Sequence, residues 1–253
     1  MLTFVFGKLF TKTPQVVGNF FQAFKWNTMA YQLVGGTIDQ VAQPILVSVR
    51  GNEDSREIRV FRKMLRFTAF LAFPAMFGLS LVANEFILAT IGEKWTDAVP
   101  LLRILCIGGA FMPFYSLYKN LIISQGRSDI NMWVNISQIV LQLLLVLLTY
   151  REGIITVVWA YTILNVVWLL VWQIYANKLI GVRFIDMLKD IVPFAVISMA
   201  VMAITWYLTS FIDNNWLLLI ARIIIAAVLY GTIMKLLKVK MMEECLNFLK
   251  RKN

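Results

Sequence analysis

The sequence contains no histidine and only two cysteines among its 253 residues. The absence of histidine excludes histidine-based catalytic triads, histidine metal ligands and histidine proton relays. Cys106 lies in an apolar run and Cys245 near the end of the chain, so we expect the two thiols to lie too far apart in membrane depth to pair. Glycine-rich phosphate loops and paired cysteines are also absent. The sequence therefore predicts no catalytic residues, no metal site, no cofactor and no enzymatic activity.

Charged residues are scarce as well, at 15% of the chain, whereas hydrophobic residues make up 60% and the mean hydropathy is +0.74. A water-soluble domain of this length does not bury so much apolar surface. The apolar residues form long uninterrupted blocks, which are typical of helices in lipid. The composition therefore predicts an all-α, polytopic membrane helix bundle.

Six apolar blocks reach the length of about 20 residues with which a helix crosses roughly 30 Å of hydrocarbon. A seventh block, 26–49, has polar residues among its apolar ones, and we expect it to span the membrane as well. The bundle should therefore contain about seven transmembrane helices. The six clear blocks are 64–91, 98–123, 132–150, 154–176, 191–212 and 216–237.

The connections between these blocks alternate between rich and poor in lysine and arginine. Cytoplasmic loops of membrane proteins carry an excess of these residues, so the alternation predicts a cytoplasmic C-terminus. The net charge of +10 is therefore interpreted as a topology signal. It does not indicate a nucleic-acid site, because the cations are spread over four connections. The rich connections are 50–66, 119–127, 178–189 and 235–252.

Three parts are expected along the chain. Residues 1–25 are interpreted as the remnant of a preceding helix or as an interfacial segment, 26–237 as the transmembrane helical domain, and 238–253 as a basic cytoplasmic tail. Seven crossings that end inside place 1–25 outside, yet this stretch holds three lysines. We therefore expect either that the chain is the later part of a longer protein or that its first helix lies on the membrane without crossing it.

The weak block 26–49 carries a polar stripe. Its members recur at three- and four-residue spacing and so share one helix face. Polar side chains in a membrane are costly unless they meet a partner or a water-filled cavity, and because the stripe includes a carboxylate, we favour a cavity wall. The stripe consists of Thr28, Gln32, Gly36, Asp39 and Gln43.

A second stripe, formed by Asn131, Asn135, Gln138 and Gln142, follows the same spacing in the block 132–150. Amides of this kind either hydrogen-bond between helices as packing contacts or line a cavity, and the residues leave both interpretations open.

Two arginines, Arg103 and Arg222, lie inside predicted spans, about two turns from their outer ends. Each arginine either extends to the membrane interface or shares a cavity with the other, where the pair would attract a phosphate. Asp39 would then offset their field or take part in ion coupling. The candidate cavity residues are Asp39, Gln43, Arg103, Gln138 and Arg222.

Helix-breaking residues fall inside two of the spans. Pro74 with Gly78 predicts an interruption in the block 64–91, and Gly108 and Gly109 with Pro113 predict one in 98–123. Kinked helices are typical of transporters, although proline is common in membrane helices of every kind.

Four segments resemble oligosaccharide flippases of the polysaccharide-transporter family, within the multidrug and oligosaccharidyl-lipid exporter superfamily. They are FQAFKWNTMAYQLVGGTIDQVAQPILVSVRG (21–51), RVFRKMLRFTAFLAFPAMFGLSLVANEFI (59–87), GEKWTDAVPLLRIL (92–105) and SQGRSDI (124–130). The resemblance extends over roughly residues 4–253.

This resemblance implies the second lobe of a two-lobed fold of 12 to 14 helices that encloses a central cavity. It also implies an oligosaccharide on an undecaprenyl pyrophosphate carrier as the substrate, moved across the bacterial inner membrane with membrane lipid around it. One lobe cannot provide alternating access alone, so a missing N-terminal lobe is an expected partner.

Three alternatives remain open. A drug or cation antiporter of the same superfamily should have a more acidic and aromatic cavity. A membrane-bound polymerase or transferase should have a sizeable outer loop with catalytic residues. A structural fragment that does not transport should show no substrate-dependent behaviour.

Overall fold

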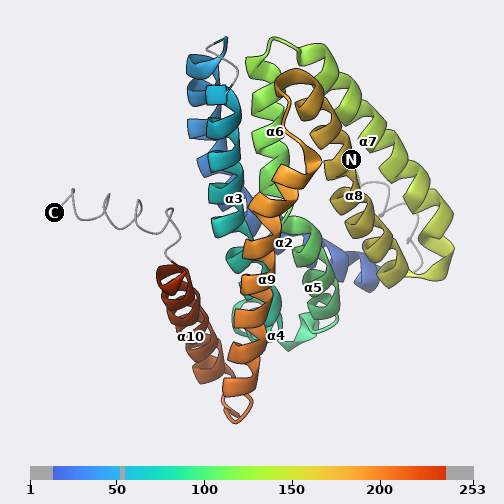
Figure 1. The fold of residues 1–253 in the computed structure, drawn as a ribbon. Coiled ribbons are helices and arrows are strands. Elements are labelled where there is room, and N and C mark those ends of the chain that lie inside the picture. The colour runs from blue at the N-terminus through green and yellow to red at the C-terminus, as the bar shows by residue number, and fades with distance from the viewer. Residues whose placement is uncertain (1–13, 52–54, 238–253) are drawn as a thin grey trace.

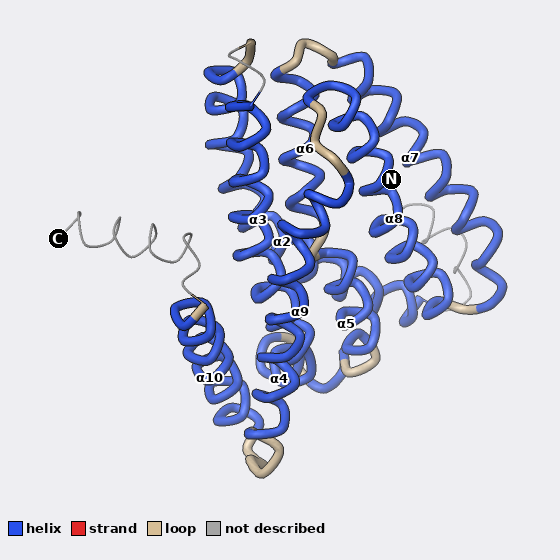
Figure 2. Tube along the Cα trace, viewed as in Figure 1, coloured by secondary structure: helices blue, strands red, loops and turns tan. Residues whose placement is uncertain are grey.

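The computed structural model describes residues 14–51 and 55–237, and within these ranges every regular element is helical (Figures 1 and 2). The expected tail at 238–253, and residues 1–13 of the expected N-terminal segment, lie outside the described residues. The longer helices are α2 (Pro14–Val49), α3 (Ser55–Leu81), α5 (Ala98–Gly109), α6 (Met112–Ser124), α7 (Ser128–Thr149), α8 (Ile154–Ile180), α9 (Phe184–Leu208) and α10 (Asn215–Leu236). The shorter elements are α4 (Ala83–Thr90) and the 3₁₀ turns η1 (Glu93–Trp95) and η2 (Tyr150–Glu152).

Six stretches are long and apolar enough to cross a membrane, which agrees with the six clear blocks of the sequence. They are Arg56–Leu81, Ala98–Ser124, Ser128–Glu152, Ile154–Ile180, Phe184–Leu208 and Asn215–Leu236. The chain is thus a multi-pass membrane helix bundle.

The helix α2 differs from these six, because it is long but interspersed with polar residues. It runs without interruption from Pro14 to Val49, and a proline is well suited to the first turn of a helix. Its 36 residues correspond to about 54 Å at 1.5 Å per residue. The boundary expected between residues 25 and 26 therefore lies inside a continuous helix.

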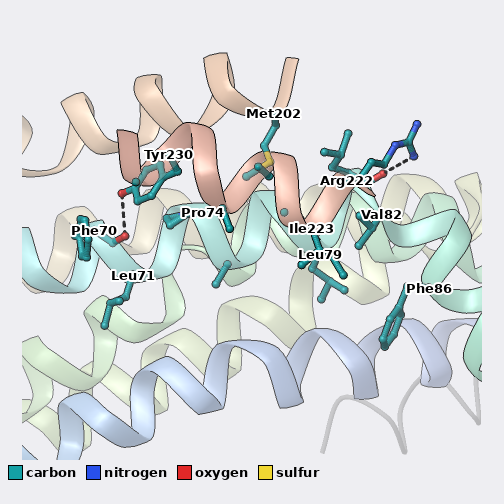
Figure 3. Close-up of a pocket in the computed structure, with 16 residues that line it drawn as sticks. Phe70, Leu71, Pro74, Leu79, Val82, Phe86, Met202, Arg222, Ile223 and Tyr230 are labelled. Carbon is teal, nitrogen blue, oxygen red and sulfur yellow. Dashed lines mark hydrogen bonds between the residues drawn. The ribbon is translucent and has the colours of Figure 1, made fainter. Parts of the chain in front are cut away.

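The block 64–91 divides at Val82 into α3 and α4, and not at Pro74. Proline has no N–H, so the carbonyl oxygen of Phe70 loses the donor that a helix would supply from position 74. The hydroxyl of Tyr230 on α10 donates to that oxygen at 2.9 Å, which satisfies it and lets α3 continue (Figure 3). The interruption expected at Pro74 with Gly78 was wrong for this reason.

The interruption expected in 98–123 is confirmed. The helix α5 ends at Gly109 and α6 begins at Met112, with Pro113 in its first turn. The helices pack closely at Gly109, because a Cβ atom there would displace the ends of the Asn27 side chain of α2 and the Met76 side chain of α3. The break therefore coincides with a close approach of three helices.

The bundle is organised around α3, which packs along α9 on one side and against α2 on another (Figure 1). The helix α2 in turn packs on α5 and α6, while α7 lies at the periphery and contacts mainly α8. The C-terminal helix α10 packs against α9 and α4 at the opposite side of the bundle from α7 (Figure 1).

An ion cluster joins α3 to α9 near the end of the bundle that carries the turn after α2. Asp190 is 3% exposed and accepts from Arg62 Nε at 2.7 Å, and Arg66 Nε lies 3.6 Å from its other oxygen. Arg62 also pairs with Asp186 at 3.0 Å. Sequence analysis assigned Arg62 and Arg66 to a cationic connection, whereas the structure places them on α3, which begins at Ser55.

Candidate functional site

Arg222 lies on α10 and is 7% exposed. Its guanidinium forms an ion pair with the Glu85 carboxylate of α4 at 2.8 Å and donates to Thr209 Oγ1 at 3.2 Å and to the Leu81 carbonyl at 3.3 Å. Arg222 therefore neither extends to the interface nor stands free in a cavity. Glu85 is the partner that sequence analysis missed, although it is a carboxylate inside the apolar block 64–91 and could have been found on that ground.

The structure does not bring Arg103 and Arg222 into one cavity. Arg103 lies on α5 with its side chain exposed, and it has no ion pair or hydrogen bond among the described residues. It is absent from the lining of the groove that Arg222 borders. The shared arginine site expected from the sequence is therefore not formed within this chain.

Three of the five members of the polar stripe of α2 are exposed, whereas the Thr28 hydroxyl is buried. Gln32, Asp39 and Gln43 are all exposed, and Asp39 is held in place by α6. Its carboxylate accepts from Asn120 Nδ2 at 2.8 Å and from Ser116 Oγ at 3.3 Å. By contrast, the exposed side chains along the middle of α8 and α10 are apolar. The exposed surface of α2 is mixed, because apolar side chains are exposed beside these polar ones, namely Met29, Leu33, Val41, Ile45 and Val47.

The second stripe makes contacts between helices. Gln138 and Gln142 of α7 each donate to the Asn165 side-chain oxygen of α8 at 3.0 Å. Asn135 instead donates to Asn131 within α7. Packing contacts therefore account for part of this stripe.

A row of cations on α3 was missed as a candidate site. Four exposed basic residues follow one another at positions i, i+3, i+7 and i+10, which places them on one helix face. The last of them, Arg66, lies about 16 Å along the helix from Ser55, the first residue of α3. The spacing is visible in the sequence and could have shown the row, but we expected this stretch to be a connection and not a helix. The cationic row consists of Arg56, Arg59, Lys63 and Arg66.

An apolar groove of about 660 Å³ lies between α3 and α10 (Figure 3). Phe70, Leu71 and Pro74 line it from α3, Arg222 and Ile223 from α10, and Met202 closes it from α9. The Tyr230 hydroxyl is engaged by the Phe70 carbonyl, so the groove offers few free polar groups. Such a groove suits a hydrocarbon chain.

The cationic row leads into the apolar groove. Arg66 and Phe70 are four residues apart, and Phe70 and Pro74 are again four apart, so all three lie on one face of α3. The arrangement joins a basic surface to an apolar groove on the same helix. It is suited to an amphiphile with an anionic head.

Comparison with known proteins relates the chain to proteins of polysaccharide biosynthesis. Residues 1–100 match the family model described as "Polysaccharide biosynthesis protein". The chain is 29% identical over 170 residues to "Teichuronic acid biosynthesis protein TuaB" of Bacillus subtilis (strain 168), covering 64% of this chain and 35% of that protein. It is 28% identical over 122 residues to "Lipopolysaccharide biosynthesis protein WzxC" of Escherichia coli (strain K12), covering 48% of this chain and 24% of that protein.

The fold is similar to that of a solved structure, "Lipid II flippase MurJ, inward closed conformation". The TM-score is 0.62 at 21% sequence identity, over 85% of this chain and 47% of MurJ. The chain thus spans about a third or less of the curated relatives' length and about half of MurJ.

The chain resembles the polysaccharide biosynthesis family over its first 100 residues, and its matches to TuaB and WzxC cover part of each relative. The resemblance found in the sequence is confirmed, as is an all-helical membrane bundle that matches about half of a flippase fold.

Proposed function

We propose that the chain is part of a transporter that moves a lipid-linked oligosaccharide, a precursor of surface polysaccharide, across the bacterial inner membrane. The observation that carries the proposal is the cationic row of α3 and its continuation into the apolar groove. Arginine and lysine bind phosphate, and charges at membrane depth mark substrate pathways. A pyrophosphate at Lys63 and Arg66 would place a polyprenyl chain in the groove.

The exposed polar face of α2 supports the same substrate. Asp39 and Gln43 present a carboxylate and an amide, and a hydrophilic sugar needs a wet, polar surface of this kind. The printed names of TuaB, WzxC and MurJ concern teichuronic acid, lipopolysaccharide and Lipid II. An anionic glycolipid is the substrate class that fits these observations together.

The transporter is proposed to need a second lobe. Alternating access requires one helix bundle to move against another around the site, and the chain matches about half of MurJ. The exposed face of α2 is the surface that such a lobe would approach across the cavity. We propose a cytoplasmic C-terminus for this arrangement, from the lysine and arginine distribution of the connections.

The alternatives fit less well. A cation antiporter would need an acidic cavity, whereas the row on α3 is basic. A polymerase or transferase would need a large outer loop, whereas the connections between α7 and α8 and between α9 and α10 are only a few residues long.

A photolabelling experiment tests the proposal. The probe is farnesyl diphosphate with a diazirine on its terminal isoprene unit, applied to the chain in lipid nanodiscs, with the matching diazirine farnesol as the uncharged control. A charge-assisted hydrogen bond contributes about 1.5 to 3 kcal/mol, so Lys63→Gln with Arg66→Gln should weaken diphosphate labelling of the groove about tenfold or more.

Lys119→Gln, an exposed cation on α6, is the matched control and should leave labelling unchanged. The proposal fails if farnesol and farnesyl diphosphate label the chain equally, or if the α3 variants label as strongly as the original chain. Thermal unfolding of each variant separates a loss of binding from a loss of folded protein.

A further inference from the structure

Polar and aromatic side chains from four helices converge between α2, α6, α7 and α8, away from the cationic row. The Tyr115 hydroxyl of α6 donates to the Asn165 carbonyl of α8, and Gln138 and Gln142 of α7 donate to the Asn165 side chain. Tyr161 lies one turn before Asn165 on α8. Tyr161 interacts electrostatically with Tyr115 and with Tyr31 of α2, so both tyrosines lie in its neighbourhood.

An unpartnered group lies at the centre of this cluster. Asn165 is fully buried and its side-chain oxygen accepts twice, whereas its nitrogen makes no hydrogen bond of ordinary geometry and faces the Tyr161 hydroxyl. An unsatisfied buried donor costs about 1 to 3 kcal/mol, and structures keep such groups mainly where they serve a purpose. The packing role of the α7 amides explains the oxygen of Asn165 but not its nitrogen.

The surrounding side chains are partly open. Tyr31, Tyr115, Tyr161 and the two α7 glutamines are all partly exposed. They combine aromatic faces, hydroxyls and amides and carry no charge. Neutral groups that donate and accept suit hydroxyl-rich molecules, whereas a pyrophosphate would need cations.

We propose that this cluster is a subsite for an uncharged sugar residue of the substrate, with tyrosine faces against the ring and amides on its hydroxyls. The cluster is defined by Tyr31, Tyr115, Gln138, Gln142, Tyr161 and Asn165. A small rotation of the Asn165 amide would direct its free N–H to a sugar oxygen. The proposal rests on the proposed function and adds where the sugar binds, separately from the diphosphate on α3.

Two probes test the subsite in nanodiscs. The first is farnesyl diphosphate linked to N-acetylglucosamine that carries a diazirine on the sugar; the second is farnesyl diphosphate with the diazirine on its terminal isoprene unit. The sugar probe should label peptides that contain Tyr115 or Tyr161. Gln138→Leu and Tyr161→Phe should each lower this labelling about fivefold or more and leave isoprene labelling of the groove unchanged.

Asn135→Leu is the matched control, because Asn135 belongs to the same α7 stripe but bonds to Asn131. It should change neither label. Tyr161→Phe keeps the ring and removes only the hydroxyl, so it tests the subsite even if Gln138→Leu does not fold.

The subsite is overturned if the sugar probe labels other parts of the chain, or if both variants are labelled at the cluster as strongly as the original chain. In either case, labelling of the groove by the isoprene probe would still support the proposed function. Absence of both labels overturns the proposed function and the subsite with it.

Discussion

The guanidinium of Arg222 on α10 lies 2.8 Å from the carboxylate of Glu85 on α4, and both side chains are almost completely buried. The same guanidinium donates to Thr209, at the end of α9, and to the last carbonyl of α3, at Leu81. One side chain thus ties four helices together. Because this end of the groove is fixed by an ion pair, we attribute to Arg222 a structural role at the groove and not the binding of phosphate.

The first prediction concerns this pair. Arg222→Gln or Glu85→Gln alone should destabilise the bundle by about 3 to 5 kcal/mol, because each leaves a charge buried without its partner. Replacement of both by leucine should cost less than the two single changes together. Equilibrium unfolding in detergent measures the free energy of unfolding of the two single variants and the double variant. Additive losses would show that the two residues do not act as a pair.

The second prediction concerns Asp190, which holds two arginines of α3 against α9. Asp190→Asn should lower the unfolding temperature markedly, because a nearly buried carboxylate and its charge-assisted hydrogen bonds are lost. Asp129→Asn is the matched control. Asp129 also pairs with an arginine, Arg127 at 3.0 Å, but on the surface, where ion pairs contribute little. Equal shifts in the two variants would contradict the prediction.

The third prediction concerns water at α2. Single cysteines at Gln40 and Gln43, introduced after both native cysteines are replaced, should react with a membrane-impermeant maleimide, because the proposed cavity beside α2 contains water. Cysteines at Ile163 and Val167 are equally exposed but lie on an apolar surface of α8, and they should react at least tenfold more slowly. Similar rates at all four positions would exclude an aqueous cavity beside α2.

Much of the fold follows from the sequence, because the length of an apolar block is set by the bilayer and not by tertiary contacts. Each of the six clear blocks overlaps one of the six spans. The structure differs from the prediction where a residue far away in the sequence determines whether a helix continues. Pro74 did not break α3, because Tyr230 satisfies the carbonyl that proline leaves free, and the two residues are far apart in the sequence.

The candidate site was less predictable, because the role of a charged or polar residue in a membrane depends on the residue that it contacts. Sequence spacing does not reveal that residue. Arg222 meets Glu85 across 137 positions and so becomes structural, while Gln138 meets Asn165 on the next helix. Periodicity predicted that Asp39 and Gln43 share one helix face at a cavity; both side chains are exposed, and the cavity stays a prediction. The basic row of α3 was hidden because a positively charged connection and a basic helix face have the same composition.

The final prediction separates the groove from the lipid-facing surface of α10. Ala227 lines the groove and Val228, its neighbour, is exposed but lies outside the groove lining. Ala227→Phe should fill much of the space between α3 and α10 and lower labelling by the isoprene diazirine probe at least fivefold. Val228→Phe adds a ring of the same kind toward lipid and should have no effect. Because both helices keep their polar contacts, unfolding temperatures should stay close. Equal labelling of the two variants would show that the prenyl chain binds elsewhere, even if the diphosphate still requires Lys63 and Arg66.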